Sequence, residues 1–123
     1  MKLAVPPGIR EDDLHAALVQ WLRYQKINGL WWHTANTHSS VQFATKLKRL
    51  GMRPGVFDLQ FLHVDGYPAF IELKTRLGRL TESQREFREF LLQNGIRHAI
   101  LRSDDTALII AETERHLRWW RFL

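Results

Sequence analysis

Two charged residues stand in an apolar stretch in the middle of the chain, Phe70-Ile71-Glu72-Leu73-Lys74. Side chains of a strand alternate between its two faces, so Glu72 and Lys74 share one face. Burying a carboxylate and an ammonium is costly unless each has a partner or a metal ion. One interpretation of the pair is a chemical role. The alternative is an ordinary surface pair at the end of a strand, because charges there are usually solvated.

Asp58 favours the chemical interpretation. It lies in a second apolar run, Val56 to Val64, and Asp65-Gly66 is a hairpin-turn signal between the two runs. Asp58 stands eight positions before Gly66 and Glu72 six positions after it, so we expect the two carboxylates near each other on adjacent strands. Carboxylates that converge in an apolar setting repel each other unless a cation lies between them. Mg²⁺ is the cation that this pattern favours, because it prefers oxygen ligands and keeps several waters.

Such a group of residues suits hydrolysis of a phosphodiester bond. We expect Asp58 and Glu72 to hold the metal ion, with the carbonyl of Leu73 as a further oxygen ligand. Lys74 would then orient or deprotonate a water and offset charge on the phosphate. An aspartate alone or an acidic-x-lysine strand alone is a weak signal, and the two in this order carry the hypothesis together.

The elements that must position these residues form one α/β domain over residues 1–123. Hydrophobic spacing and end signals predict the order helix, strand, helix, strand, strand, helix, strand, helix. The expected bounds are a helix from Glu11 to Ile27, a strand from Leu30 to Thr34, a helix capped by Ser39 or Ser40 that ends at Gly51, strands from Val56 to Val64 and from Pro68 to Lys74, a helix between Thr81 and Asn94, a strand from Arg97 to Arg102, and a helix from Asp104 or Asp105 toward Leu117. The last strand should run parallel to the second strand of the hairpin, which gives a mixed sheet.

Composition narrows the function classes. The chain has 123 residues, of which 45% are hydrophobic and 25% charged, which is ordinary for a globular domain. The formal charge of +5 favours a polyanionic partner such as nucleic acid, although many small proteins are simply basic. Cysteine is absent from the sequence, which excludes disulfides and thiolate zinc sites. No apolar run reaches the length of a membrane span and no signal-peptide pattern opens the chain, so we expect a cytoplasmic protein without a membrane partner.

Four segments resemble the virus-type replication-repair nuclease domain, VRR-NUC, a branch of the PD-(D/E)XK nuclease superfamily. They are Gly55-Val56-Phe57-Asp58-Leu59, Ile71-Glu72-Leu73-Lys74, Leu80-Thr81-Glu82-Ser83-Gln84 and Asn94-Gly95-Ile96. The resemblance runs from Glu11 to about Leu101, and the predicted elements look like the αβββαβ core of that superfamily. It implies a restriction-endonuclease-like fold, with helices flanking a mixed central sheet. One departure is Phe57, which stands where the family usually has proline.

The resemblance implies that Asp58, Glu72 and Lys74 are catalytic. It also implies that Glu11 is an accessory acidic residue of the metal site and that Gln84 flanks the site. Physical alternatives stand beside the last two roles. Glu11 could only favour the positive end of its helix, and Gln84 could only close the capping box at the start of its own helix.

Basic residues flank the acidic centre on both sides along the chain, and we expect them to contact DNA phosphates. They are Lys46, Lys48, Arg49 and Arg53 before it and Arg76 and Arg79 after it. Two solvated loops are the alternative interpretation. The resemblance also puts His33 and Asn36 near the substrate groove. Arg85 and Arg88 alternate with glutamates, and we interpret them as part of a salt-bridged helix face.

These observations predict a structure-selective endodeoxyribonuclease that uses Mg²⁺, with Mn²⁺ as a substitute. The resemblance suggests branched DNA, with four-way (Holliday) junctions as the leading substrate, and a homodimer whose two-fold symmetry suits them. Trp119-Trp120 is the candidate subunit interface. One rival is a non-catalytic DNA-binding or assembly module that keeps the fold, which the presence of all three catalytic residue types disfavours. Another is a restriction-type nuclease, which would need additional segments to read a sequence in the major groove.

Overall fold

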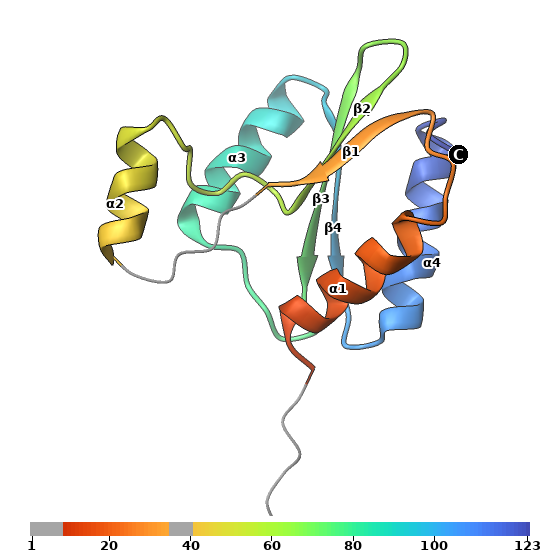
Figure 1. The fold of residues 1–123 in the computed structure, drawn as a ribbon, viewed down its shortest axis with the longest axis horizontal. Coiled ribbons are helices and arrows are strands. Elements are labelled where there is room, and N and C mark those ends of the chain that lie inside the picture. Colours follow the sequence, from red (N-terminus) through yellow and green to blue (C-terminus); the bar gives the residue numbers. More distant parts are fainter. Residues whose placement is uncertain (1–8, 35–40) are drawn as a thin grey trace, which may run out of the picture.

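A four-stranded mixed sheet is the centre of the fold. The structure is a computed structural model and describes residues 9–34 and 41–123. Its elements are α1 (Glu11–Leu22), β1 (Gly29–His33), α2 (Val41–Arg49), β2 (Leu59–His63), β3 (Pro68–Lys74), α3 (Glu82–Gln93), β4 (Arg97–Arg102) and α4 (Thr106–Trp119). The strands lie in the order β1-β2-β3-β4, and the pairs are antiparallel except for the parallel pair of β3 and β4. Figure 1 shows α1 and α4 together on one side of the sheet and α3 on the other.

Alternation along the strands divides the core into two layers. One face of the sheet, with Leu59 and Ile71, is buried against α1 and α4. The other face carries a smaller cluster, in which Phe70 packs edge-to-face on Phe87 of α3. Glu72 and Lys74 lie on this second face, since they alternate with Ile71 and Leu73. The two charged side chains are therefore on the α3 side of the sheet.

The predicted order of elements is confirmed, including the hairpin of β2 and β3 and the parallel strand β4. The first predicted boundary that differs is the end of α1, which lies at Leu22 rather than Ile27. The backbone leaves the helix at Arg23, and the N–H of Asn28 donates to the carbonyl of Phe122 instead of continuing a helix. Across residues 9–34 and 41–123, no helix combines the length and apolar character needed to cross a bilayer.

The second difference is the start of β2, which lies at Leu59 rather than Val56. The residues before it are held by the end of β1, where the N–H of Thr34 donates to the carbonyl of Asp58 at 2.8 Å. The hydroxyl of Thr34 donates to the carbonyl of Phe57. Asp58 is thus at the entrance of β2 rather than inside it, and its carboxylate accepts a hydrogen bond from the backbone of Leu73 in β3.

The aromatic doublet near the end of the chain is divided between the core and the surface. Trp120 is buried in the core that α1 and α4 cover, whereas Trp119 is 79% exposed. Phe122 is fully buried in the same core. The prediction of Trp119-Trp120 as an interface is therefore wrong for Trp120, because this ring packs inside its own chain.

Candidate active site

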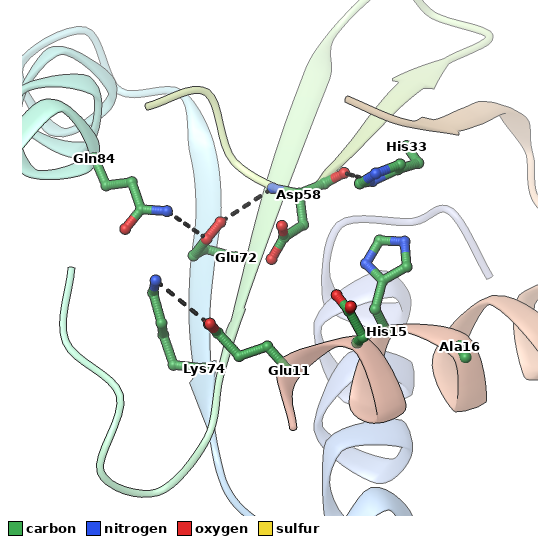
Figure 2. Close-up of a pocket in the computed structure, with 9 residues that line it drawn as sticks. Glu11, His15, Ala16, His33, Asp58, Glu72, Lys74 and Gln84 are labelled. Carbon is green, nitrogen blue, oxygen red and sulfur yellow. Dashed lines mark hydrogen bonds and ion pairs between the residues drawn. The ribbon is translucent and has the colours of Figure 1, made fainter. Parts of the chain in front are cut away.

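Asp58 and Glu72 meet at the end of the β2–β3 hairpin. Leu59 is paired with Ile71, which puts Asp58, one residue earlier, opposite Glu72. The N–H of Asp58 donates to Oε1 of Glu72 at 3.2 Å, and the N–H of Leu73 donates to Oδ2 of Asp58 at 2.8 Å. These two hydrogen bonds hold both carboxyl groups at one end of β3, and Figure 2 shows the first of them.

Glycine is required in the loop that delivers Asp58 to this position. Gly55 has a φ of +86°, which side chains rarely adopt, and it touches the start of α3. A Cβ at this position would lie 2.4 Å from the carbonyl of Ser83 and 2.8 Å from the nitrogen of Gln84. The loop and the first turn of α3 can approach this closely only because no side chain separates them.

Glu72 is almost completely buried, with 1% of its surface exposed. Gln84 at the start of α3 donates from Nε2 to Oε2 of Glu72 at 3.1 Å, in addition to closing the capping box with Thr81. Burial and the adjacent Asp58 carboxylate raise the pKa of Glu72 to about 9, against the opposing influence of Lys74. In the protein alone, the neutral form of Glu72 therefore predominates at pH 7.

Lys74 is also buried, and α1 supplies its partner. Its Nζ lies 3.3 Å from Oε1 of Glu11, the first residue of α1. The side chain of Glu11 is about half exposed. The ion pair joins the start of this helix to the end of β3, as Figure 2 shows. Glu11 thus contacts the ammonium, whereas Asp58 and Glu72 contact each other.

A cavity of about 350 Å³ lies in the middle of these residues. Its lining comprises Glu11, Asp12, His15, Ala16, His33, Asp58, Glu72, Lys74 and Gln84. The structure thus brings together six side chains that the sequence pointed to, from α1, β1, the entrance of β2, β3 and α3. His33 also contacts the carbonyl of Asp58 through Nδ1 at 2.9 Å.

Asp12, His15 and Ala16 are the lining residues that sequence reasoning missed. The ring of His15 packs against that of His33, with 4.3 Å between the centroids. Burial, helped by the neighbouring His33, lowers the pKa of His15. A signal was present, because His15 lies four residues after Glu11 and residues at that spacing share one face of a helix.

The basic residues predicted to bind DNA do not line this cavity. Lys46, Lys48 and Arg49 are exposed on α2, which Figure 1 shows beyond α3 and away from α1. Arg53 lines a groove along α3, and Arg76 and Arg79 line another one after β3. Asn36 lies outside the described residues.

The donor set at the end of β3 fits a hydrated divalent cation. Within the described parts of the chain, no group of three or more His, Asp or Glu side chains is arranged to hold a metal ion together. Asp58 and Glu72 nevertheless converge, and the carbonyl of Leu73 points to the same side of the strand as its N–H, which is bonded to Asp58. Mg²⁺ is commonly bound through one or two carboxylates while keeping several waters. Two carboxylates and one carbonyl therefore suffice for it.

Comparison with known proteins identifies a solved structure with a similar fold. No protein-family model matches the sequence, and no curated protein matches it. A solved structure described as a "VRR_NUC domain protein" is similar, with a TM-score of 0.67 and 22% sequence identity over 91% of this chain and 91% of that one. At this identity the likeness concerns the course of the backbone. The chain therefore has the fold of a VRR-NUC domain, a mixed sheet with flanking helices of the restriction-endonuclease type.

Proposed function

We propose that the chain is a metal-dependent DNA endonuclease that hydrolyses phosphodiester bonds. The observation that carries the proposal is the pair of hydrogen bonds from the N–H groups of Asp58 and Leu73 to the two carboxyl groups. These bonds keep the carboxyl groups of Asp58 and Glu72 together beside buried Lys74. Burying such groups together costs stability, so a chemical role explains them better than packing does. The solved VRR_NUC domain structure of the same fold supports this reaction class.

In this proposal Asp58 and Glu72, with the carbonyl of Leu73, hold a divalent cation, Mg²⁺ with Mn²⁺ as a substitute. The bound cation would supply positive charge to the scissile phosphate and lower the pKa of a water. Gln84 keeps the carboxyl group of Glu72 in place through the hydrogen bond from its amide.

Lys74 and Glu11 complete the proposed centre. The ion pair with Glu11 and the burial of its side chain fix the position of the Lys74 ammonium. The side chain of Lys74 would therefore need little rearrangement when a phosphate binds. It offsets negative charge that develops on the phosphate and orients the attacking water, which is the use of a preorganised charge. Glu11 is an accessory residue that acts through Lys74 and borders the metal site.

The substrate in this proposal is branched DNA, such as a four-way (Holliday) junction, bound by a homodimer. The net charge of +5 supports a polyanionic partner, and a two-fold dimer would present two centres to a junction of similar symmetry. Exposed Trp119 offers a second copy an apolar contact at the end of α4. Lys46, Lys48, Arg49, Arg53, Arg76, Arg79, His33 and Asn36 are the proposed DNA contacts.

The test is cleavage of a labelled synthetic four-way junction beside a linear duplex and a single strand, with Mg²⁺, with Mn²⁺ and with chelator. Lys74→Ala should lower the rate by about 100- to 1000-fold, because one positioned electrostatic group commonly contributes that much. Lys26→Ala is the matched control, since Lys26 is an exposed lysine beyond the other end of α1. Its rate should stay at that of the unchanged protein.

Other results would redirect the proposal. Tight junction binding without cutting under either metal would indicate a non-catalytic DNA-binding module with a nuclease fold. Cutting that is undiminished in Lys74→Ala would remove this residue from the mechanism. Cutting of linear duplexes at one sequence, rather than of junctions with unrelated sequences, would indicate a restriction-type nuclease.

A further inference from the structure

The charged residues of α3 lie on two flanks of the helix instead of pairing with each other. Glu82, Glu86 and Glu89 line the groove that also contains Arg53. Arg88 lies on the opposite flank, toward β4, and Arg85 lies between the two flanks, since it borders both the groove with the glutamates and the hollow after β3. Among the ion pairs of residues 9–34 and 41–123, none involves either arginine. The prediction that Arg85 and Arg88 form salt bridges along the face of their helix is therefore wrong.

Two adjoining hollows on that flank form a basic groove, here named the α3–β4 arginine groove. They share Leu80 and Arg102. The arginines that line them are Arg76, Arg79, Arg85, Arg88 and Arg102. In the described part of the chain no carboxylate residue belongs to the lining of either hollow, and the neighbouring Asp104 contacts only the outermost arginine, Arg76, at 3.7 Å. The groove thus concentrates positive charge, of which only that of Arg76 is offset by an ion pair among the described residues.

Two of these arginines are held in position by the loop after β3. Arg102 donates from Nε to the carbonyl of Gly78 at 2.9 Å, and Arg85 donates from Nη1 to the carbonyl of Leu80 at 3.0 Å. A guanidinium has five N–H donors, so each side chain keeps donors for a ligand after making its contact with the loop. Preorganised guanidinium groups suit phosphate oxygens, which they can bind through two parallel hydrogen bonds.

The groove begins next to the candidate active site. Arg102 is paired with Lys74 in the parallel register of β3 and β4, so the two residues lie on the same face of the sheet, one strand apart. On α3, Gln84 bonds to Glu72 while the next residue, Arg85, borders the groove. A strand of DNA whose phosphate reaches Lys74 would therefore have its neighbouring phosphates within reach of these arginines.

We propose that the α3–β4 arginine groove binds backbone phosphates of the DNA strand on which the centre acts. The identity of the polyanion rests on the proposed nuclease function, but binding in the groove needs no metal ion. The inference adds Arg85, Arg88 and Arg102 to the DNA-binding residues and gives them a larger role than the lysines of α2, which lie on the other side of α3.

Arg79→Ala combined with Arg88→Ala tests the groove, because neither side chain makes a described hydrogen bond that the loop depends on. The matched control is Arg23→Ala with Lys26→Ala, which removes two exposed positive charges beyond the far end of α1. Binding of a fluorescent four-way junction and a duplex is measured by anisotropy in chelator between roughly 50 and 200 mM salt, a range over which lost phosphate contacts change the affinity strongly. Thermal melts check that all variants are folded.

We expect the groove variant to bind roughly 4- to 25-fold more weakly, since exposed ion pairs contribute up to about fivefold each. The slope of log affinity against log salt should fall by about 2, close to one released counterion per lost contact. The control should change neither quantity appreciably, and Arg79→Lys with Arg88→Lys should restore the slope. An unchanged slope in the groove variant, or an equal change in the control, overturns the inference.

The outcomes separate the groove from the nuclease proposal. Groove-dependent binding without metal-dependent cutting would keep the groove and reject the nuclease. Metal-dependent cutting together with unaltered binding in the groove variant would keep the nuclease and reject the groove.

Discussion

Metal binding at the acidic centre should release a proton from Glu72. Without a cation, burial and Asp58 raise the pKa of Glu72 to about 9, so about 1% of this group is ionised at pH 7. A cation held by both carboxylates requires that proton to leave, which costs about 3 kcal/mol at pH 7. We therefore expect the apparent affinity for Mg²⁺ or Mn²⁺ to rise nearly tenfold per pH unit between about pH 6 and 8 and to level off above pH 9.

Isothermal titration calorimetry measures this linkage directly. Titrations with Mn²⁺ at pH 6, 7 and 8, each in two buffers of different ionisation enthalpy, give the number of protons released per ion bound. We expect about one proton at pH 7 and about half a proton near pH 9, where about half of the Glu72 carboxyl groups are already ionised. Asp65→Asn, in an exposed carboxylate of the hairpin turn, controls for general charge effects and should behave like the unchanged protein.

Glu72→Gln sharpens the interpretation because it removes the titrating group while keeping the shape of the side chain. This variant should bind the ion more weakly, and its remaining affinity should lose most of its pH dependence. An affinity that is independent of pH in the unchanged protein, with no proton released at pH 7, would refute the reasoning. Glu72 would then either be ionised before the ion arrives or not be a ligand.

Two predictions concern stability. Gly55→Ala should lower the free energy of unfolding by at least about 2 kcal/mol, as a Cβ there combines strained φ with overpacking. Gly51→Ala is the control, because the φ of Gly51 is similar at +98° but no described atom lies within 4 Å of its Cβ position. In urea titrations of both variants, Gly51→Ala should lose less stability. Equal losses would contradict the close contact between Gly55 and Ser83. In chelator, the melting temperature should fall as the pH rises from about 5 to 9. The pKa of Glu72 is about 9 in the folded protein and near 4.5 in the unfolded chain, so between these values the folded state keeps a proton that the unfolded state has lost. The stabilisation is complete below about pH 4.5 and is lost as the pH approaches 9. The free energy of unfolding should change by at most about 1.4 kcal/mol per pH unit. Calorimetry of Glu72→Gln should show a flatter dependence of the melting temperature on pH. An equally steep dependence in this variant would assign the effect to other groups.

Local signals were sufficient to predict how Asp58 meets Glu72. The alternation of β3 fixes which side chains share a face, and a slip of one residue would move all of them to the other face. The turn at Gly66 then sets the register, so the two carboxyl groups converge. The place of Gln84 beside the site was implied by the family resemblance, and its spacing to the buried residues Phe87 and Leu91 along α3 is compatible with it.

Contacts between distant segments decided what the sequence did not predict. The backbone of Asn28, after α1, is held by the carbonyl of Phe122 and that of Asp58, before β2, by Thr34, and neither contact is a local signal. The helical spacing of α3 is compatible with ion pairs between its arginines and glutamates. Its packing on the sheet instead turns Arg88 toward β4. Helical periodicity gives the angle between two side chains but not what lies opposite each of them.

The residues after α4 have a consequence for how the chain reaches its native state. The carbonyls of Trp120, Arg121 and Phe122 accept hydrogen bonds from Tyr67, from His63 in the corresponding tautomer, and from Asn28. These contacts join the end of the chain to the hairpin and to the segment before β1, and such non-local contacts are expected to slow folding. A fragment limited to residues 55–102 would contain Asp58, Glu72 and Lys74 without this closure. We therefore expect the geometry of the acidic centre to depend on the rest of the domain, and an isolated hairpin and helix to lose it on another scaffold.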